Sequence, residues 1–289
     1  MRLAPFRLHR PTTVDEATGL LRELGPDALP YCGGTELLLV AKLGLTDFTD
    51  LVDLKAIQEL SGIEANGELG IGATTTHREI ERSPLVRERW PSLALMERQV
   101  GNIRVRSVGT IGGNLCFADP HSDPATYLIA AGGSLITRSL SGTRHIPVEE
   151  FTRGPYETAL APAELLVSIH LPPLPTNSAL VHRKMAFHER PAITVATNIT
   201  VRDGLVSQAR VAVGSVGVAA QRLVETEQSL LGLDAISPDA VALSPCAQTA
   251  AKESEPVEDA NGSVEYKRQL VRVLITRCVR ATLVETVGT

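Results

Sequence analysis

Residues 99–123 read QVGNIRVRSVGTIGGNLCFADPHSD, and their centre is the run Gly109-Thr-Ile-Gly-Gly-Asn114. Two adjacent glycines permit a tight turn and let the backbone approach a ligand closely. The exposed N–H groups of such a loop can wrap an anion, most often a phosphate, without a lysine. We therefore favour a cofactor-binding loop here over the alternative, a plain turn between two strands.

A second glycine pair lies about eighty residues upstream, in the stretch LPYCGGTELL at 29–38. A short strand is expected before Gly33-Gly34, and a helix is expected over 36–43 after Thr35. The N-terminus of a helix presents unpaired N–H groups that suit a pyrophosphate, and Thr35 is expected to cap that helix. Neither loop matches the G-x-G-x-x-G or the G-x-x-x-x-G-K pattern. Two glycine-threonine loops far apart in the sequence are instead expected to clasp one dinucleotide between them.

The runs Cys32-Gly-Gly-Thr-Glu-Leu37 and Thr110-Ile-Gly-Gly-Asn114 resemble the two FAD-binding segments of the flavoprotein subunits of molybdenum hydroxylases. That group includes the medium subunit of carbon monoxide dehydrogenase and the FAD domain of xanthine dehydrogenase. The resemblance covers nearly the whole chain, including the strand-like run 164–169. The two motifs in this order are specific, whereas either motif alone is weak.

The resemblance implies an α+β fold, with a two-lobed FAD-binding domain of the vanillyl-alcohol-oxidase/PCMH type and a C-terminal α+β domain of antiparallel sheet and helices. We expect the domains at 1–60, 61–175 and 176–289. The proline run Pro172-Pro-Leu-Pro175 marks the last boundary. Strand-like runs followed by helical ones favour an α+β arrangement after it.

The resemblance also implies the residues that bind FAD, and it identifies no catalytic residue. Residues 31–37 would contact the pyrophosphate and the flavin side, and residues 110–114 would close the other side. Asp123 would contact the cofactor, Lys184 would lie near the flavin, and two apolar residues would pack near the rings. The expected contacts are Tyr31, Cys32, Gly33, Gly34, Thr35, Glu36, Leu37, Thr110, Ile111, Gly113, Asn114, Asp123, Leu166, Lys184 and Ile193.

In function, the resemblance implies an FAD-dependent oxidoreductase that acts as one subunit of a larger complex. Its partners would be a small subunit with iron–sulfur clusters and a large subunit with the molybdenum cofactor, and its acceptor NAD, a quinone or another small molecule. A stand-alone flavin oxidoreductase and a module that has lost its flavin remain alternatives. His77, His121 and His188 are the histidine candidates for acid–base chemistry, and we expect His77 to be a surface or capping residue.

The composition favours a globular protein over a nucleic-acid-binding or membrane-spanning one. The 289 residues are 43% hydrophobic and 21% charged, as in a soluble globular protein, and the net charge of −5 gives no reason to expect a nucleic-acid partner. No apolar run reaches membrane-spanning length and no signal peptide is evident, so we expect a cytoplasmic protein. The four cysteines lack C-x-x-C spacing, so no metal site is expected.

Periodicity predicts the principal helices and strands. A helix over 12–24 is expected to begin with a capping box of Thr13 and Glu16. Arg104 and Arg106 are expected to pair with surface carboxylates rather than with a phosphate. Further helices are expected at 74–80, 90–100, 124–131 and 264–283, and strands at 29–32, 50–54, 69–73, 134–137, 164–171, 179–187, 193–201 and 209–216.

Overall fold

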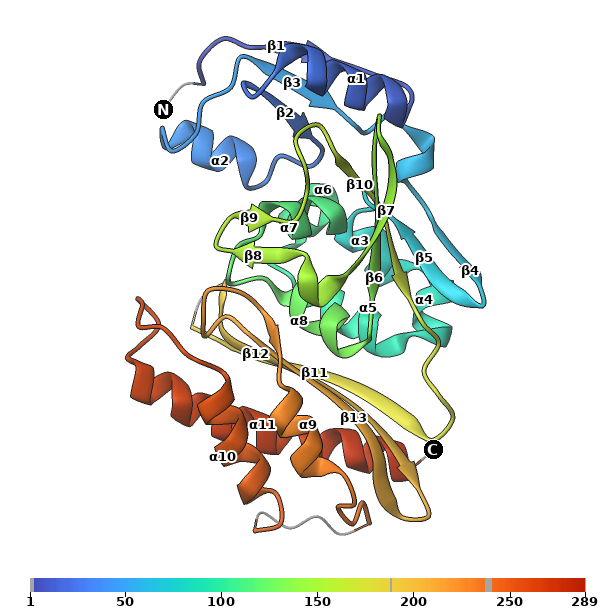
Figure 1. Ribbon diagram of the computed structural model, residues 1–289, viewed down its shortest axis with the longest axis vertical. Helices are drawn as coiled ribbons and strands as arrows, with labels where there is room; N and C mark the ends of the chain where they lie inside the picture. Colours follow the sequence, from blue (N-terminus) through green and yellow to red (C-terminus); the bar gives the residue numbers. More distant parts are fainter. Residues whose placement is uncertain (1–2, 188, 237–240, 289) are drawn as a thin grey trace. The chain divides into compact units, whose positions relative to one another are not determined.

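The computed structural model describes residues 3–187, 189–236 and 241–288. The chain forms two compact units: the first comprises the residues up to 118 together with 134–171, and the second comprises 119–133 together with the residues from 172 onward. The segment 119–133 therefore packs with the second unit, although it lies between two parts of the first unit in the sequence. Figure 1 shows the elements of each unit under the labels used below.

The N-terminal part of the first unit is a three-stranded parallel sheet. Its strands stand in the order β1 (Arg7–His9), β3 (Asp50–Asp53) and β2 (Ala28–Tyr31). Apolar residues at helical spacing along α1 (Val14–Leu24) form one buried cluster with this sheet and with the 3₁₀ turn η1 (Gln58–Leu60). The cluster consists of Val14, Ala17, Leu21, Ala28, Val52, Leu54, Ile57, Leu60 and Leu165.

Helix α1 begins where the Thr13 hydroxyl accepts a hydrogen bond from the Glu16 N–H at 3.1 Å. The Glu16 carboxylate accepts from the N–H of Thr12 at 2.8 Å rather than from that of Thr13. Only one half of the predicted capping box therefore forms. The helix ends at Gly25, whose φ of +76° is readily adopted only by glycine.

The rest of the first unit surrounds a five-stranded antiparallel sheet. Its strands stand in the order β4 (Ile63–Asn66), β5 (Glu68–Gly72), β10 (Leu165–Leu171), β6 (Ser134–Ser139) and β7 (Gly142–Pro147). A two-stranded ribbon of β8 (Thr152–Gly154) and β9 (Glu157–Thr158) follows the 3₁₀ turn η2 (Val148–Glu150). The helices of this unit after α1 are α2 (Leu37–Lys42), α3 (His77–Arg82), α4 (Pro84–Arg89), α5 (Pro91–Glu97), α6 (Ile103–Val108) and α7 (Ile111–Phe117).

The second unit is an antiparallel sheet with helices on it. Its strands stand in the order β11 (Ser178–Ala186), β12 (Pro191–Arg202), β13 (Leu205–Gly214) and β14 (Gln221–Arg222). Helices α9 (Val224–Leu230), α10 (Ser244–Glu253) and α11 (Val264–Val287) share one apolar core with the sheet, and α8 (Asp123–Ala130) packs on β12 and β13. At the hairpin between β12 and β13, Asp203 and Gly204 have φ of +52° and +79°, as a type I′ turn requires.

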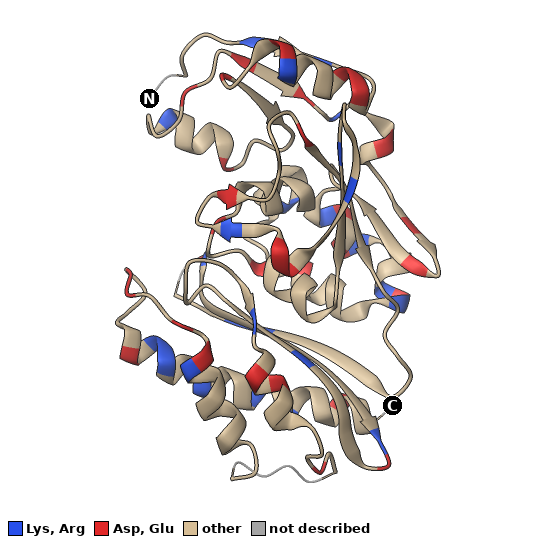
Figure 2. Ribbon diagram, viewed as in Figure 1, with Lys and Arg blue, Asp and Glu red and all other residues tan. Residues whose placement is uncertain are grey.

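The sequence pattern predicted most of these elements. The expected strands occur as β2, β3, β5, β6 and β10–β13, and the expected helices occur as α1, α2, α3, α5, α8 and α11. The α+β fold class is confirmed, with an antiparallel sheet and helices in the C-terminal part. Helices α4 and α6, each six residues long, were not predicted, and α7 lies where a loop was expected. Figure 2 shows acidic and basic residues interspersed over both units.

Glu164, just before β10, is a buried carboxylate that joins three segments of the first unit. Its oxygens accept hydrogen bonds from the Arg144 guanidinium on β7 (2.8 Å from Nε), from the Thr137 hydroxyl on β6 and from the Ala161 N–H (2.7 Å). Burial acts to raise the pKa of Glu164, but these hydrogen bonds and the Arg144 charge together hold the pKa below its ordinary value.

The substitution Glu164→Gln is expected to lower the free energy of unfolding by about 1–3 kcal/mol at neutral pH, because it removes the charge from hydrogen bonds in a buried setting. The folded-state pKa is lowered, so this contribution is present above the ordinary pKa of about 4.3 and is lost as the pH falls through the folded-state pKa. Urea unfolding followed by circular dichroism measures both effects, and Glu157→Gln on the exposed edge of β9 is the control. Equal midpoints for Glu164→Gln and the parent protein at neutral pH would contradict this role.

Candidate functional site

The first glycine segment, residues 31–37, leaves β2 and enters α2. Gly34 has a φ of +65°, and a Cβ at this position would lie 2.6 Å from Cε2 of Tyr31. The prediction that Thr35 caps the helix is wrong: Glu36 holds the N-cap position with helical dihedral angles, and no side chain caps this end. The Thr35 hydroxyl lies near Gly109 instead, 3.5 Å from where a Cβ on Gly109 would stand.

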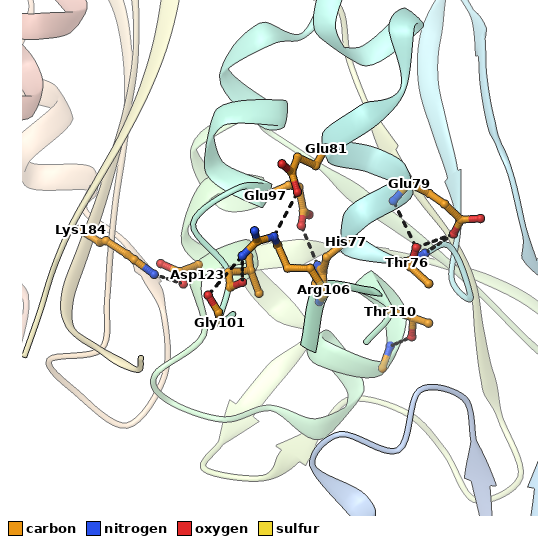
Figure 3. Close-up of polar contacts among 12 residues, drawn as sticks. Thr76, His77, Glu79, Glu81, Glu97, Gly101, Arg106, Thr110, Asp123 and Lys184 are labelled. Atoms are coloured by element: carbon orange, nitrogen blue, oxygen red, sulfur yellow. Dashed lines mark hydrogen bonds and ion pairs between the residues drawn. The ribbon is translucent and has the colours of Figure 1, made fainter. Parts of the chain in front are cut away.

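The second glycine segment is the first turn of a helix rather than a loop. Thr110 is the N-cap of α7, and its hydroxyl accepts a hydrogen bond from the Gly113 N–H at 3.0 Å, as Figure 3 shows. Gly112 and Gly113 both lie inside the helix, without positive φ. The surroundings of these two glycines, and not an unusual backbone conformation, therefore explain why glycine occupies both positions.

The two glycine segments touch each other, as the clasp hypothesis requires. A Cβ on Gly33 would lie 2.1 Å from the carbonyl oxygen of Val108 and 2.9 Å from the Cα of Gly109, so only glycine fits at position 33. The side chain of Thr110 interacts with the Cys32 thiol, which adds a second link. Burial raises the pKa of Cys32 to about 12, so the thiol stays protonated and acts as a small packing group.

The neighbouring glycines of α7 have opposite surroundings. A Cβ on Gly112 would lie 2.5 Å from the carbonyl oxygen of Ala73, so this glycine is needed for packing. Gly113 is exposed, and a Cβ there would meet only the Thr110 hydroxyl, at 2.8 Å. Gly113 thus exposes the backbone of the first turn of α7 without a side chain over it, which fits close approach by a phosphate group of a cofactor.

Residues 73–77 hold the second glycine segment in place from below. Backbone N–H groups of Ile111 and Gly112 donate to the carbonyls of Thr75 (3.1 Å) and Ala73 (2.9 Å). The N–H of His77 donates in turn to the carbonyl of Gly109 at 3.1 Å. These backbone hydrogen bonds from residues 73–77 therefore fix the position of the glycines of α7.

His77 is not the surface or capping residue that the sequence suggested. Its side chain is 2% exposed, and Nδ1 lies 2.6 Å from the carboxylate of Glu97 on α5, which is fully buried. Thr76 caps α3 instead, in a capping box with Glu79 (Figure 3). The hydrogen bond between these two buried side chains joins α3 to α5, which pack against each other.

Arg106 pairs with a carboxylate, as predicted. Its Nε lies 3.1 Å from Glu81, and its Nη1 donates to the carbonyls of Val100 and Gly101 (Figure 3). The guanidinium is thereby committed to holding α6 against α3.

The remaining predicted contacts lie in both units. Leu166 is buried on β10 of the first unit. In the second unit, Lys184 on β11 donates from Nζ to the Asp123 carboxylate at 2.9 Å, so the structure brings these two predicted residues together. Ile193 is fully buried in the apolar core that includes α11. His188 falls outside the described residues.

One polar residue of this region was missed by the sequence analysis. His182 stands two positions before Lys184 on β11 and lies near Asp123, 4.0 Å from Nε2 to Oδ1. The sequence could have indicated His182, because it stands two residues before Lys184 on an expected strand and residues two apart on a strand share a face.

The described residues contain no group of three or more His, Cys, Asp or Glu side chains arranged to hold a metal ion. In the same parts of the chain, no helix has the length and apolar character needed to cross a membrane.

Comparison with known families matches the two parts of the chain to two models. Residues 4–174 match the FAD binding domain in molybdopterin dehydrogenase, and residues 183–282 match the CO dehydrogenase flavoprotein C-terminal domain. The carbon monoxide dehydrogenase medium chain of Hydrogenophaga pseudoflava is 31% identical over 96% of both chains. The nicotine 6-hydroxylase medium subunit of Paenarthrobacter nicotinovorans is 28% identical over 96% of this chain and 98% of its own.

Solved structures agree with these matches. A chain of the carbon monoxide dehydrogenase from Hydrogenophaga pseudoflava superimposes with a TM-score of 0.93, at 31% identity and 98% coverage of both chains. A chain of quinoline 2-oxidoreductase from Pseudomonas putida 86 gives a TM-score of 0.92, at 26% identity and 99% coverage of both.

The fold and the paired glycine segments define a flavoprotein with an FAD-binding domain. The chain belongs to the family of FAD-binding subunits of molybdopterin dehydrogenases, the flavoprotein medium subunits of molybdenum-containing hydroxylases and dehydrogenases. The family resemblance in the sequence is thereby confirmed. The individual FAD contacts and the three domain boundaries stay predictions.

Substitution of the two glycines of α7 is expected to separate packing from cofactor binding. Gly113→Val is expected to lose less stability than Gly112→Val, because its Cβ meets only the Thr110 hydroxyl and no backbone atom, and to lose most of its FAD. Gly112→Val is expected to lose about 1–3 kcal/mol or more of unfolding free energy, because the side chain overlaps the backbone of Ala73. Thermal unfolding and flavin content per folded chain measure the two effects. A folded Gly113→Val with undiminished FAD would show that this turn does not bind the cofactor.

Proposed function

We propose that the two glycine segments of the first unit hold the pyrophosphate of FAD. The observation that carries the proposal is the contact between the two segments, at Gly33 and Val108–Gly109, next to the solvent-exposed Gly113. Backbone N–H groups of residues 31–37 bind the phosphate oxygens, supported by the hydroxyl of Thr35, and residues 110–114 close the other side. The N–H groups of Ile111, Gly112 and Gly113 already donate within the chain, so this second segment contributes close approach rather than N–H donors. The residues of this pyrophosphate clasp are Tyr31, Cys32, Gly33, Gly34, Thr35, Glu36, Leu37, Thr110, Ile111, Gly113 and Asn114.

The flavin end of the cofactor is bound by four further residues. Asp123 contacts cofactor hydroxyls, Lys184 lies near the flavin, and Leu166 and Ile193 pack near its rings. The pairing of Lys184 with Asp123 supports this assignment, because it keeps an ammonium group in a mostly buried place. When bound, FAD supplies both one-electron and two-electron transfer.

The chain acts as an electron relay within a complex. It matches 96% of the length of a protein named as a medium chain and 98% of another named as a medium subunit. A small subunit with iron–sulfur clusters delivers electrons that a large molybdenum-containing subunit takes from an organic substrate. The FAD that this chain holds would supply the transfer of these electrons to a small-molecule acceptor such as NAD or a quinone. The complex works in the cytoplasm.

The clasp predicts the identity of the flavin. Flavin released by heat from the purified chain is expected to be FAD, because FMN lacks the pyrophosphate that two glycine segments would enclose. Chromatography against FAD and FMN standards makes the measurement. FMN, or a colourless chain after incubation with excess FAD, would overturn the proposed clasp.

The relay predicts how electrons enter. A tagged copy of the chain, expressed with its native neighbours, is expected to co-purify with one iron–sulfur polypeptide and one molybdenum-containing polypeptide. An organic substrate that bleaches the flavin of this complex anaerobically is expected to leave the isolated FAD-loaded chain oxidised.

Dithionite is the control, since it should bleach both preparations and show that the isolated flavin is reducible. Rapid bleaching of the isolated chain by the organic substrate would instead indicate a stand-alone flavin oxidoreductase.

A further inference from the structure

His182 is a buried histidine on the strand that carries Lys184. Its side chain is 1% exposed, and neither of its ring nitrogens has a hydrogen-bond partner among the described residues. An unpartnered buried polar group destabilises the folded state, so such a group in a native protein calls for an explanation. An apolar ring of similar size would avoid that cost in the same space.

The groups that face His182 form a small charged cluster. From α8, Asp123 places Oδ1 4.0 Å from Nε2 of His182, and this carboxylate is 4% exposed. From the same strand, Lys184 holds the other oxygen of Asp123 at 2.9 Å (Figure 3). The residue opposite on β12 is Ala196, which has no charge. Asp123 therefore lies between an ammonium group and an imidazole.

His182 is neutral in this arrangement. Burial and the positive charge of Lys184 lower its pKa to about 3. The imidazole nevertheless lies only about 0.8 Å beyond hydrogen-bond reach of the carboxylate that Lys184 neutralises. If Lys184 turned away from Asp123, the carboxylate would lose that positive charge, and a protonated His182 would be placed to replace it.

We propose that His182 accepts one proton when the bound flavin is reduced. Lys184 then turns toward the added negative charge, and the imidazolium of His182 takes its place as a cationic partner of Asp123. The inference rests on the proposed function, because it requires Lys184 to face the flavin. His182 is thus a proton acceptor that acts through Asp123 and Lys184.

The step conserves charge and atoms. Two electrons come from a one-electron donor such as an iron–sulfur centre, in two transfers, and are held by the flavin. One proton from solvent goes to the flavin and a second goes to Nε2 of His182. No bond between heavy atoms forms or breaks.

The first test needs no cofactor. Histidine ring signals in the NMR spectrum report the protonation of His182 as the pH is lowered. In the parent protein His182 is expected to stay neutral down to about pH 5. In Lys184→Met the pKa of His182 is expected to rise, because the ammonium group that repels its charged form is gone and the Asp123 carboxylate remains. Lys184→Gln serves if Lys184→Met does not fold. An unchanged titration would show that Lys184 does not control His182 and would overturn the inference.

The second test measures the pH dependence of the flavin midpoint potential in the FAD-loaded chain between about pH 6 and about pH 8. The parent protein is expected to take up one more proton per two electrons than His182→Phe, which makes its slope steeper by about 30 mV per pH unit. His145→Phe, which removes an exposed imidazole on β7, is expected to keep the parent slope.

The outcomes separate the two proposals. A chain that binds no FAD overturns the proposed function and this inference with it. A chain that binds FAD with equal slopes in the parent protein and His182→Phe overturns this inference alone.

Discussion

The close approach of two backbones, at Gly33 and at Val108–Gly109, is the constraint on which the rest of the first unit depends. The carbonyl oxygen of Val108 occupies the place where any other residue at position 33 would carry its Cβ. Strand β2, which delivers Gly33, and helix α6, which delivers Val108, must therefore be fixed to within a few tenths of an ångström. The parallel sheet under β2 and the Arg106 contacts of α6 provide that precision.

Buried polar groups support the second glycine segment. Residues 73–77 bind the segment through their backbones, and the buried pair of His77 and Glu97 fixes the helices that carry and support them. A buried ion pair or hydrogen-bonded dyad is weak evidence for stability, but it specifies one arrangement over others. In this unit the specified arrangement is the position of α7.

The sequence predicted elements whose signal is local and failed where the deciding partner is distant. Alternation and the Asp203-Gly204 turn located the antiparallel strands, since both signals lie within a few residues. Glycine has low helix propensity, so a Gly-Gly pair suggested a loop, whereas contact with Ala73 requires glycine inside helix α7. His77 looked exposed because its partner, Glu97, lies twenty residues away in sequence. The candidate site came from family resemblance, and strand alternation could have added His182 to it, because His182 stands two residues before Lys184 on one strand.

The placement of α8 has a consequence for how such a gene can change. The backbone passes from one unit to the other after residues 118, 133 and 171, so no single cut in the chain separates the two units. A piece that ended at the proline run would carry α8 without the sheet it covers, and the complementary piece would leave that face of the sheet bare. During synthesis, α8 leaves the ribosome before any strand of its own sheet. Recombination between relatives can therefore exchange the second unit intact only if both of its segments are inherited together.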